Sequence, residues 1–266
     1  MPSQSITSVS NPHIKKVLQL RERKARYECG LTIIEGVREV SCALAAGLKP
    51  QELFVCPEFF HDRGEAGLVG KIGKSATVFE VSKKVFEKIS YGERHEGVLA
   101  VGQPQAVALH GLKLSSVPFV VIVESVEKPG NLGAILRTCD AAGVEALILC
   151  DPATDLYNPN IIRSSLGTIF SVPTVTASLE ETKQFLNTNK IKICAAAPQA
   201  VQVYTGADLR GALAIVLGSE QKGLTDFWLK NSSLQVKIPM RGKADSLNVS
   251  NTAAILIYEA FRQRSS

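Results

Sequence analysis

Residues 117–151 carry the pattern that most constrains the fold. The run VPFVVIVES, residues 117–125, is continuously apolar, which is typical of a strand buried on both faces. A helical pattern follows from Asn131 to the stop at Gly143, and the apolar segment 144–151 comes directly after it. A strand, a helix and a second strand form a βαβ unit, which requires a parallel sheet with a right-handed crossover. The sequence therefore predicts an α/β protein.

Strand and helix patterns alternate on both sides of a weakly patterned linker. Before the linker, the expected elements are a helix over 11–20, strands over 31–36, 52–56, 77–82 and 97–102, and helices over 37–47 and 83–90. After it, further strands are expected over 191–197, 212–218 and 234–239, with a closing helix over about 247–264. We therefore predict a small α/β domain over 1–104, a linker over 105–116 and a second α/β domain over 117–266.

Composition excludes several classes of protein. No apolar run approaches the roughly 18 residues that a membrane span needs, and Met1 to Thr7 lacks the apolar core of a signal peptide. The cysteines and histidines are dispersed, without the clustering of a zinc site, so we expect no metal and free thiols in a cytoplasmic protein. These residues are Cys29, Cys42, Cys56, Cys139, Cys150, Cys194, His13, His61, His95 and His110.

Positive charge is concentrated near the N-terminus. The formal net charge is +5, which permits a polyanionic partner without requiring one. Six cations crowd this segment and only Glu22 opposes them: Lys15, Lys16, Arg21, Arg23, Lys24 and Arg26. The charges alone fit a solvated helix face and a nucleic-acid contact equally well.

Three loops that follow predicted strands carry the polar side chains of interest, because parallel sheets bind ligands at the carboxyl ends of their strands. The first loop is ESVEKPGNLGAILR, residues 124–137. Asn131 is expected to cap the helix that begins there. Arg137 lies in an otherwise apolar helix, where it is either a functional cation or a snorkelling surface side chain.

The second loop, residues 217–225, nearly matches a phosphate-binding P-loop. Gly218, Gly223 and Thr225 have the P-loop spacing, but Leu224 stands where the lysine is required. Glu220 inside the loop would also repel phosphate. The sequence therefore disfavours a nucleotide hydrolase or a nucleotide-dependent switch.

The third loop leads into the closing helix. Ser246, Asn248, Ser250 and Asn251 cluster at its start. One polar side chain is enough to cap a helix, so the surplus favours a functional site.

Together, the three loops resemble the motifs of the SpoU (TrmH-like) branch of the SPOUT RNA methyltransferases. The matching residues are Pro129, Gly130, Asn131, Gly133 and Arg137; Leu217, Gly218, Glu220, Gly223 and Leu224; and Ile238, Pro239, Ser246, Leu247, Asn248, Val249 and Ser250. The resemblance is strongest over residues 117–266. The N-terminal half more loosely resembles the family's auxiliary RNA-binding domain, which is akin to a ribosomal-protein fold.

The resemblance implies a SPOUT domain, a parallel sheet whose C-terminal segment forms a deep trefoil knot, and a homodimer through that domain. It implies methyl transfer from S-adenosylmethionine to a ribose 2′-hydroxyl in 23S ribosomal RNA. Two alternatives stay open: a transfer RNA target, and an RNA-binding protein that has kept the fold without catalysis. Methylation of a base is disfavoured, because the other SPOUT branches carry different motifs.

The resemblance also assigns site residues. The catalytic residues are Arg137, Asn131, Glu220, Ser246 and Asn248. Arg137 is expected either to act as a base or to bind phosphate and stabilise an alkoxide. The cofactor is expected to contact Ala196, Leu217, Gly218, Ile238, Met240 and Leu247. The RNA-binding residues are Lys15, Lys16, Arg21, Arg23, Lys24, Arg26 and Arg163.

Overall fold

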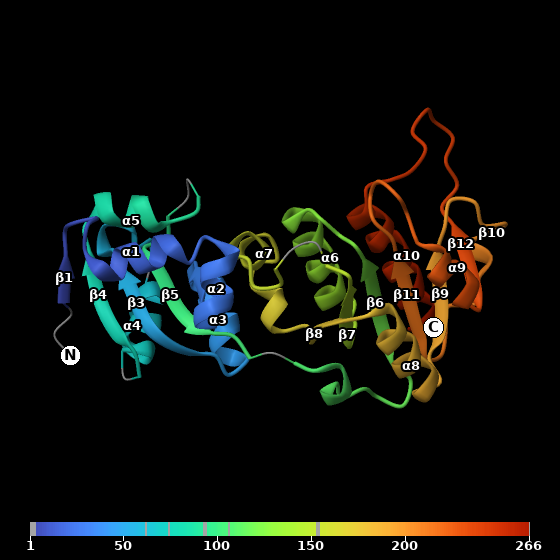
Figure 1. Ribbon diagram of the computed structural model, residues 1–266, viewed down its shortest axis with the longest axis horizontal. Helices are drawn as coiled ribbons and strands as arrows, with labels where there is room; N and C mark the ends of the chain where they lie inside the picture. The colour runs from blue at the N-terminus through green and yellow to red at the C-terminus, as the bar shows by residue number, and fades with distance from the viewer. Residues whose placement is uncertain are drawn as a thin grey trace. The chain divides into compact units, whose positions relative to one another are not determined.

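The computed structural model describes residues 4–61, 63–73, 75–92, 95–105, 107–152 and 155–265 (Figure 1). It divides into two compact units. Unit 1 is Met1–Gln105 with Asp155–Ser171, and unit 2 is Ala106–Thr154 with Val172–Ser266. The predicted linker coincides with the first division between the units. Asp155–Ser171 interrupts the sequence of unit 2 and packs with unit 1. The sequence patterns did not predict this.

Unit 1 is built on a five-stranded sheet in the order β1-β4-β3-β5-β2. The β1–β4 and β3–β4 pairs are parallel, whereas β5 is antiparallel to β3 and β2. The strands are β1 (Gln4–Ile6), β2 (Thr32–Glu35), β3 (Lys49–Val55), β4 (Thr77–Val81) and β5 (Val98–Gln103). The helices are α1 (Pro12–Gln19), α2 (Arg23–Cys29), α3 (Val37–Ala45), α4 (Arg63–Ile72), α5 (Lys83–Ile89) and α7 (Pro159–Ser164).

Local sequence explains where several of these helices begin and end. The Asn11 side chain accepts a hydrogen bond from the His13 N–H, as expected of an N-cap that precedes Pro12. Helix α2 ends at Gly30, whose φ of 66° is the left-handed conformation that glycine adopts most easily. The predicted strands and helices of this half are therefore confirmed, and α2 and α4 are additional.

Unit 2 is built on a seven-stranded parallel sheet in the order β10-β12-β9-β11-β6-β7-β8. The strands are β6 (Phe119–Glu124), β7 (Ala146–Cys150), β8 (Thr174–Ala177), β9 (Lys192–Ala196), β10 (Gln202–Val203), β11 (Leu213–Leu217) and β12 (Leu234–Lys237). The helices are α6 (Pro129–Ala141), α8 (Leu179–Thr188), α9 (Asp226–Asn231) and α10 (Val249–Arg264). The predicted α/β class and parallel sheet are confirmed.

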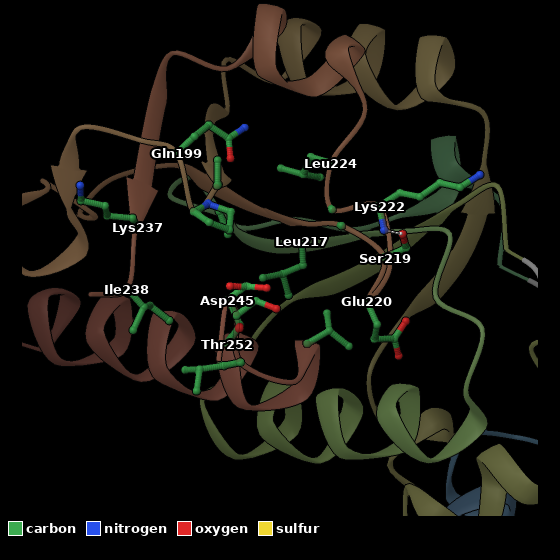
Figure 2. Close-up of a pocket in the computed structure, with 18 of the residues that line it drawn as sticks. Gln199, Leu217, Ser219, Glu220, Lys222, Leu224, Lys237, Ile238, Asp245 and Thr252 are labelled. Carbon is green, nitrogen blue, oxygen red and sulfur yellow. Dashed lines mark hydrogen bonds between the residues drawn. The ribbon is translucent and has the colours of Figure 1, made fainter. Parts of the chain in front are cut away.

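Helices cover both faces of this sheet. One face packs Val120, Ile148 and Val216 with Leu186 of α8 and Trp228 of α9. On the opposite side, α10 packs against α6 and β11, and Figure 2 shows these two helices side by side beneath the strand ends. Because both faces are covered, the central strands are continuously apolar, as the pattern of residues 117–125 indicated.

The strand order places the functional loops next to one another. Strand β11 lies between β6 and β9, and β12 lies beyond β9. The loops that leave the carboxyl ends of β6, β9, β11 and β12 therefore meet at one edge of the sheet. The trefoil knot stays a prediction. Among the described residues, no helix combines the length and apolarity that crossing a membrane requires.

Candidate cofactor and catalytic site

A cavity of about 360 Å³ lies at this edge of the unit 2 sheet (Figure 2). Its wall comes from the ends of β9, β11 and β12, from the loops after them and from the first turns of α10. The volume falls within the range of about 300–1,000 Å³ that small-ligand sites occupy.

All six residues predicted to bind the cofactor line this one cavity: Ala196, Leu217, Gly218, Ile238, Met240 and Leu247. They come from three loops that are far apart in the sequence. The structure thus brings the predicted set together, whereas their contacts with a cofactor stay a prediction.

The loop after β11 is folded tightly on itself. Ser219 and Gly223 exchange backbone hydrogen bonds of 3.1 and 3.0 Å, and Gly223 has a φ of 65°. A Cβ atom on Gly218 would overlap the backbone of Gly223 and Leu224. These two glycines are therefore required for a compact turn, and the turn does not form an open phosphate cradle.

Glu124 anchors the far end of the same loop. Its carboxylate is 1 % exposed at the end of β6 and accepts hydrogen bonds from the Thr225 N–H (2.9 Å) and hydroxyl (2.7 Å). In a P-loop the residue at the position of Thr225 would bind magnesium, but here its hydroxyl is held by a buried carboxylate. This contact supports the exclusion of a P-loop nucleotidase.

Asn131 links the three loops beside the cavity. Its side-chain amide donates a hydrogen bond to Glu220, and its carbonyl oxygen accepts one of 3.2 Å from the Asn248 amide. The prediction that Asn131 caps α6 is wrong. The helix begins two residues earlier, with Lys128 at the N-cap position and Pro129 as its first residue. The Asn131 side chain is consequently available for contacts between loops.

Asn248 has the capping role predicted for it. Its carbonyl oxygen accepts hydrogen bonds from the Ser250 N–H (2.9 Å) and hydroxyl (2.7 Å). The same side chain therefore begins α10 and contacts Asn131. Ser246 is exposed at the cavity wall, just before this cap.

Arg137 lies on the exposed side of α6, about two turns after Asn131. Among the described residues, none makes a hydrogen bond or ion pair with its guanidinium group. The structure therefore joins Asn131, Glu220 and Asn248 in one hydrogen-bonded chain, with Ser246 nearby on the cavity wall. It leaves Arg137 outside that chain.

Asp245, Gln199 and Thr252 also line the cavity, although no sequence motif assigned them to a site. Figure 2 shows Asp245 facing the space between Leu217 and Thr252. Asp245 immediately precedes Ser246 in the third motif, so its position was the available signal. Gln199 follows β9, and the loop after that strand carries no polar motif in the sequence. Only the three-dimensional arrangement shows that Gln199 lies at the cavity.

The cations predicted to bind RNA have different environments in unit 1. Lys15, Arg23, Lys24 and Arg163 are exposed. Lys16 pairs with Glu52 at 3.3 Å. The half-buried Arg21 donates hydrogen bonds to the Lys88 and Ser90 carbonyls and lies over the Tyr91 ring at 4.9 Å.

Arg26 differs from these exposed cations. Its side chain is only 5 % exposed, and its guanidinium group contacts Asp155 Oδ2 at 2.7 Å and the Leu20 and Arg21 carbonyls at 2.7 Å each. Its Nε and Nη1 groups bond to protein and fix α2 to the chain around it. The structure therefore gives Arg26 a structural role, and its contact with RNA stays a prediction that this burial disfavours.

A half-buried carboxylate lies near Arg163. Glu35 accepts a 2.6 Å hydrogen bond from the Tyr91 N–H. Burial raises the pKa of Glu35, while this hydrogen bond and the charges of Arg163 and Arg21 act in the opposite direction. A Cβ atom on Gly92 would overlap the Arg163 guanidinium, so glycine lets that side chain lie close to the backbone.

An open parallel sheet with a ligand-sized cavity at its strand ends defines an α/β protein that binds a small ligand there. The described residues contain no group of three or more histidine, cysteine, aspartate or glutamate side chains able to hold a metal ion.

Comparison with known proteins narrows this class. The SpoU rRNA methylase family matches residues 118–258, and the MRM3-like substrate binding domain matches residues 11–100. The 23S rRNA (guanosine(2553)-2′-O)-methyltransferase RlmP of Bacillus subtilis is 28 % identical, over 95 % of this chain and 97 % of that protein.

Solved structures agree with these matches. A crystal structure of an RNA 2′-O ribose methyltransferase is 38 % identical, with a TM-score of 0.88 over 99 % of this chain and 100 % of that one. An AdoMet-bound rRNA methyltransferase from Sinorhizobium meliloti is 27 % identical, with a TM-score of 0.89 over 98 % of each chain.

The chain belongs to the SpoU rRNA methylase family. It is an RNA methyltransferase that uses S-adenosylmethionine, as the three loop motifs predicted.

Proposed function

We propose that this enzyme transfers the methyl group of S-adenosylmethionine to a ribose 2′-hydroxyl of 23S ribosomal RNA. The observation that carries the proposal is the convergence of three family motifs on one cavity, with Asn131 hydrogen-bonded to both Glu220 and Asn248 at its side. Relatives named as 23S rRNA 2′-O-methyltransferases support the substrate.

The residues of the cavity fit this cofactor. Leu217, Ile238 and Leu247 offer an apolar wall for an adenine ring, and Gly218 lets the backbone approach closely. Asp245 adds a carboxylate near Leu217, suited to a positively charged ligand. When bound, S-adenosylmethionine supplies an activated methyl group on a cationic sulfur.

The chain's own groups must orient the ribose and stabilise charge on its oxygen. We assign Asn131, fixed from both sides by Glu220 and Asn248, to positioning, with Ser246 beside the hydroxyl. We assign Arg137 to the adjacent phosphate and the developing alkoxide, because guanidinium groups are very hard to deprotonate. Its exposure favours this role over that of a base, which would require desolvation.

The test is methyl transfer from labelled S-adenosylmethionine to total RNA from a strain that lacks this gene, followed by digestion to nucleosides. We expect a labelled 2′-O-methylnucleoside with the wild-type enzyme, and a loss of about 100-fold or more with Arg137→Ala. Arg137→Lys should recover little, because lysine lacks the bidentate geometry.

Other outcomes would redirect the assignment. Label on the base would overturn ribose methylation, and label confined to transfer RNA would overturn the ribosomal substrate. RNA binding without any label would indicate a protein that kept the fold and lost the reaction. Near-normal turnover by Arg137→Lys would contradict a role for the guanidinium shape.

We further propose that unit 1 holds the RNA through exposed cations, with Lys15, Arg23, Lys24 and Arg163 as phosphate contacts. The match of residues 11–100 to a substrate binding domain supports this assignment. Reversing the charges of Arg23 and Lys24 should weaken RNA binding and reduce its salt dependence. An unchanged affinity and salt slope would refute it.

We also propose a homodimer through the C-terminal domain, in the cytoplasm where ribosomal RNA is modified. Tyr258 and Phe261 support the dimer: they are 48 % and 42 % exposed on α10 and pack edge to face at 5.9 Å. Exposed neighbouring aromatic rings are typical of interfaces. Sedimentation of the wild type and of Tyr258→Ser with Phe261→Ser tests it, since a monomeric wild type would refute the dimer.

A further inference from the structure

An aromatic ring on α2 projects almost entirely into solvent. Tyr27 is 90 % exposed, about twice the exposure of Tyr258 or Phe261. Its side chain makes no ring contact, hydrogen bond or ion pair with any other described residue. The fold therefore gains almost nothing from burial of this ring, whose apolar faces are open to a ligand.

Helix α2, which carries Tyr27, is fixed to the rest of unit 1 through the residue next to that tyrosine. The neighbouring Arg26 points into unit 1, where it bonds to Asp155 and to the carbonyls of Leu20 and Arg21. At the end of the helix, the Gly30 N–H donates a 2.8 Å hydrogen bond to the Arg26 carbonyl. Tyr27 is thus presented on a fixed backbone, so ordering it against a ligand costs little entropy.

Two exposed cations share the face of Tyr27. Arg23 and Lys24 precede it by four and three residues, the spacings at which helical side chains are neighbours. Glu28 pairs with Lys24 at 3.8 Å, and both side chains of that pair are largely exposed. The pair is therefore well solvated and leaves Lys24 able to contact a phosphate.

We propose that Tyr27 is a stacking platform for one unpaired base of the RNA substrate, with Arg23 and Lys24 holding the phosphates on either side of that base. The proposal rests on the proposed function for its substrate. An open aromatic face beside cations is the combination that recognises single-stranded RNA, because the ring stacks on a base while the charges follow the backbone.

A protein partner fits the same surface less well. The apolar area is a single ring bordered by positive charge, whereas stable protein interfaces bury about 800 Å² on each partner around an apolar centre. The observations therefore favour an extruded base over a second copy of the chain or another protein.

The experiment compares wild type, Tyr27→Ala and Tyr27→Trp in the full-length enzyme. The probe is a 12-nucleotide single-stranded RNA with one 2-aminopurine, whose fluorescence is quenched on stacking. We expect Tyr27→Ala to weaken binding about 5- to 150-fold and to abolish the quenching, because each base stacked on an aromatic side chain contributes that much. Tyr27→Trp should retain both. The slope of affinity against salt should stay constant, because no charge has been removed.

Val201→Ala is the matched control, since that side chain is 94 % exposed in unit 2 and should leave RNA binding unchanged. Thermal unfolding should be the same for Tyr27→Ala and wild type. Unaltered affinity and quenching in Tyr27→Ala would overturn the platform, as would an equal loss in Tyr27→Trp. A change of oligomeric state in Tyr27→Ala with unchanged RNA binding would assign the ring to a second copy instead.

The methyl-transfer assay separates this inference from the proposed function. In the wild type it reports whether the enzyme methylates RNA at all, independently of Tyr27. If it does, Tyr27→Ala should raise KM for the RNA while kcat and the affinity for S-adenosylmethionine remain near wild type. A fall in kcat with unchanged KM would contradict a role in binding.

Discussion

At the scale of single residues, neighbouring cations on one helix have opposite roles. Arg23 and Lys24 face solvent, whereas Arg26 is buried with Asp155 and two backbone carbonyls. The sequence presents all three as equivalent positive charges. Rotation of about 100° per residue turns Arg26 away from Lys24, but what distinguishes Arg26 from Arg23 is its partner Asp155, 129 positions away.

Removal of either partner of the Arg26–Asp155 pair should destabilise unit 1. We expect Arg26→Met or Asp155→Asn to lower the free energy of unfolding by about 3 kcal/mol. Arg26→Met leaves the Leu20 and Arg21 carbonyls without their donor, and Asp155→Asn leaves the buried guanidinium without its counter-charge. Urea unfolding followed by far-UV circular dichroism measures this change. The only tryptophan, Trp228, lies in unit 2, so its fluorescence should report a smaller shift. Lys24→Met is the exposed control, and an equal effect there would contradict the argument.

At the scale of elements, the loop after β11 is closed by its glycines and by Glu124. Local spacing suggested a P-loop, and the missing lysine and the charge of Glu220 were the sequence features against it. The structure supplies the reason: Ser219 pairs with Gly223, and Thr225 is tied to the end of β6. This compact loop forms one wall of the cavity.

Gly218→Ala should open this loop and weaken cofactor binding. The added methyl group would overlap the backbone of Gly223, and crowding of this kind costs about 1–3 kcal/mol. We expect the affinity for S-adenosylmethionine, measured by calorimetry, to fall about tenfold or more. Gly206→Ala is the control, because its added Cβ would meet no atom within 4 Å. Normal affinity in Gly218→Ala would show that the loop does not shape the cofactor site.

Most of the helices and strands could be predicted from the sequence, because these elements follow from local patterns. Residues 117–125 and 144–151 were predicted as strands from apolar runs, and Asn248 as a cap from its place before the closing helix. Asn131 was misassigned as the cap of α6 because Pro129 can begin a helix equally well. Which of the two residues begins the helix depends on the path of the preceding turn. The contacts of Asn131 with Glu220 and Asn248 join residues 89 and 117 positions apart, beyond the reach of any local pattern.

At the scale of the whole molecule, the exposure of each cysteine shows whether its part of the chain lies in a core or at the surface. Cys56, Cys139, Cys150 and Cys194 are buried, whereas Cys29 is exposed. Burial raises the pKa of Cys150 to about 11 and that of Cys194 to about 12, so both stay protonated near neutral pH.

A thiol reagent at pH 8 should therefore distinguish Cys29 from the four buried cysteines. We expect Cys29 to react fast and the half-buried Cys42 more slowly in the native enzyme, and all six thiols to react after unfolding. Cys29→Ser should remove the fast phase. Rapid reaction of a second, buried cysteine would reveal local opening of the core that contains it. As the pH rises toward 11, the thiolate fraction of Cys150 increases, so any residual reaction there should accelerate.

The placement of Asp155–Ser171 in unit 1 limits how recombination can exchange the two units between related genes. The polypeptide passes between the two units three times: after Gln105, before Asp155 and after Ser171. Neither unit is encoded by one uninterrupted stretch of the gene. A recombination breakpoint near codon 105 would transplant α2 without Asp155, the residue to which Arg26 is anchored. A chimera that exchanges unit 1 between relatives must therefore carry two segments, and one crossover should yield an unstable protein.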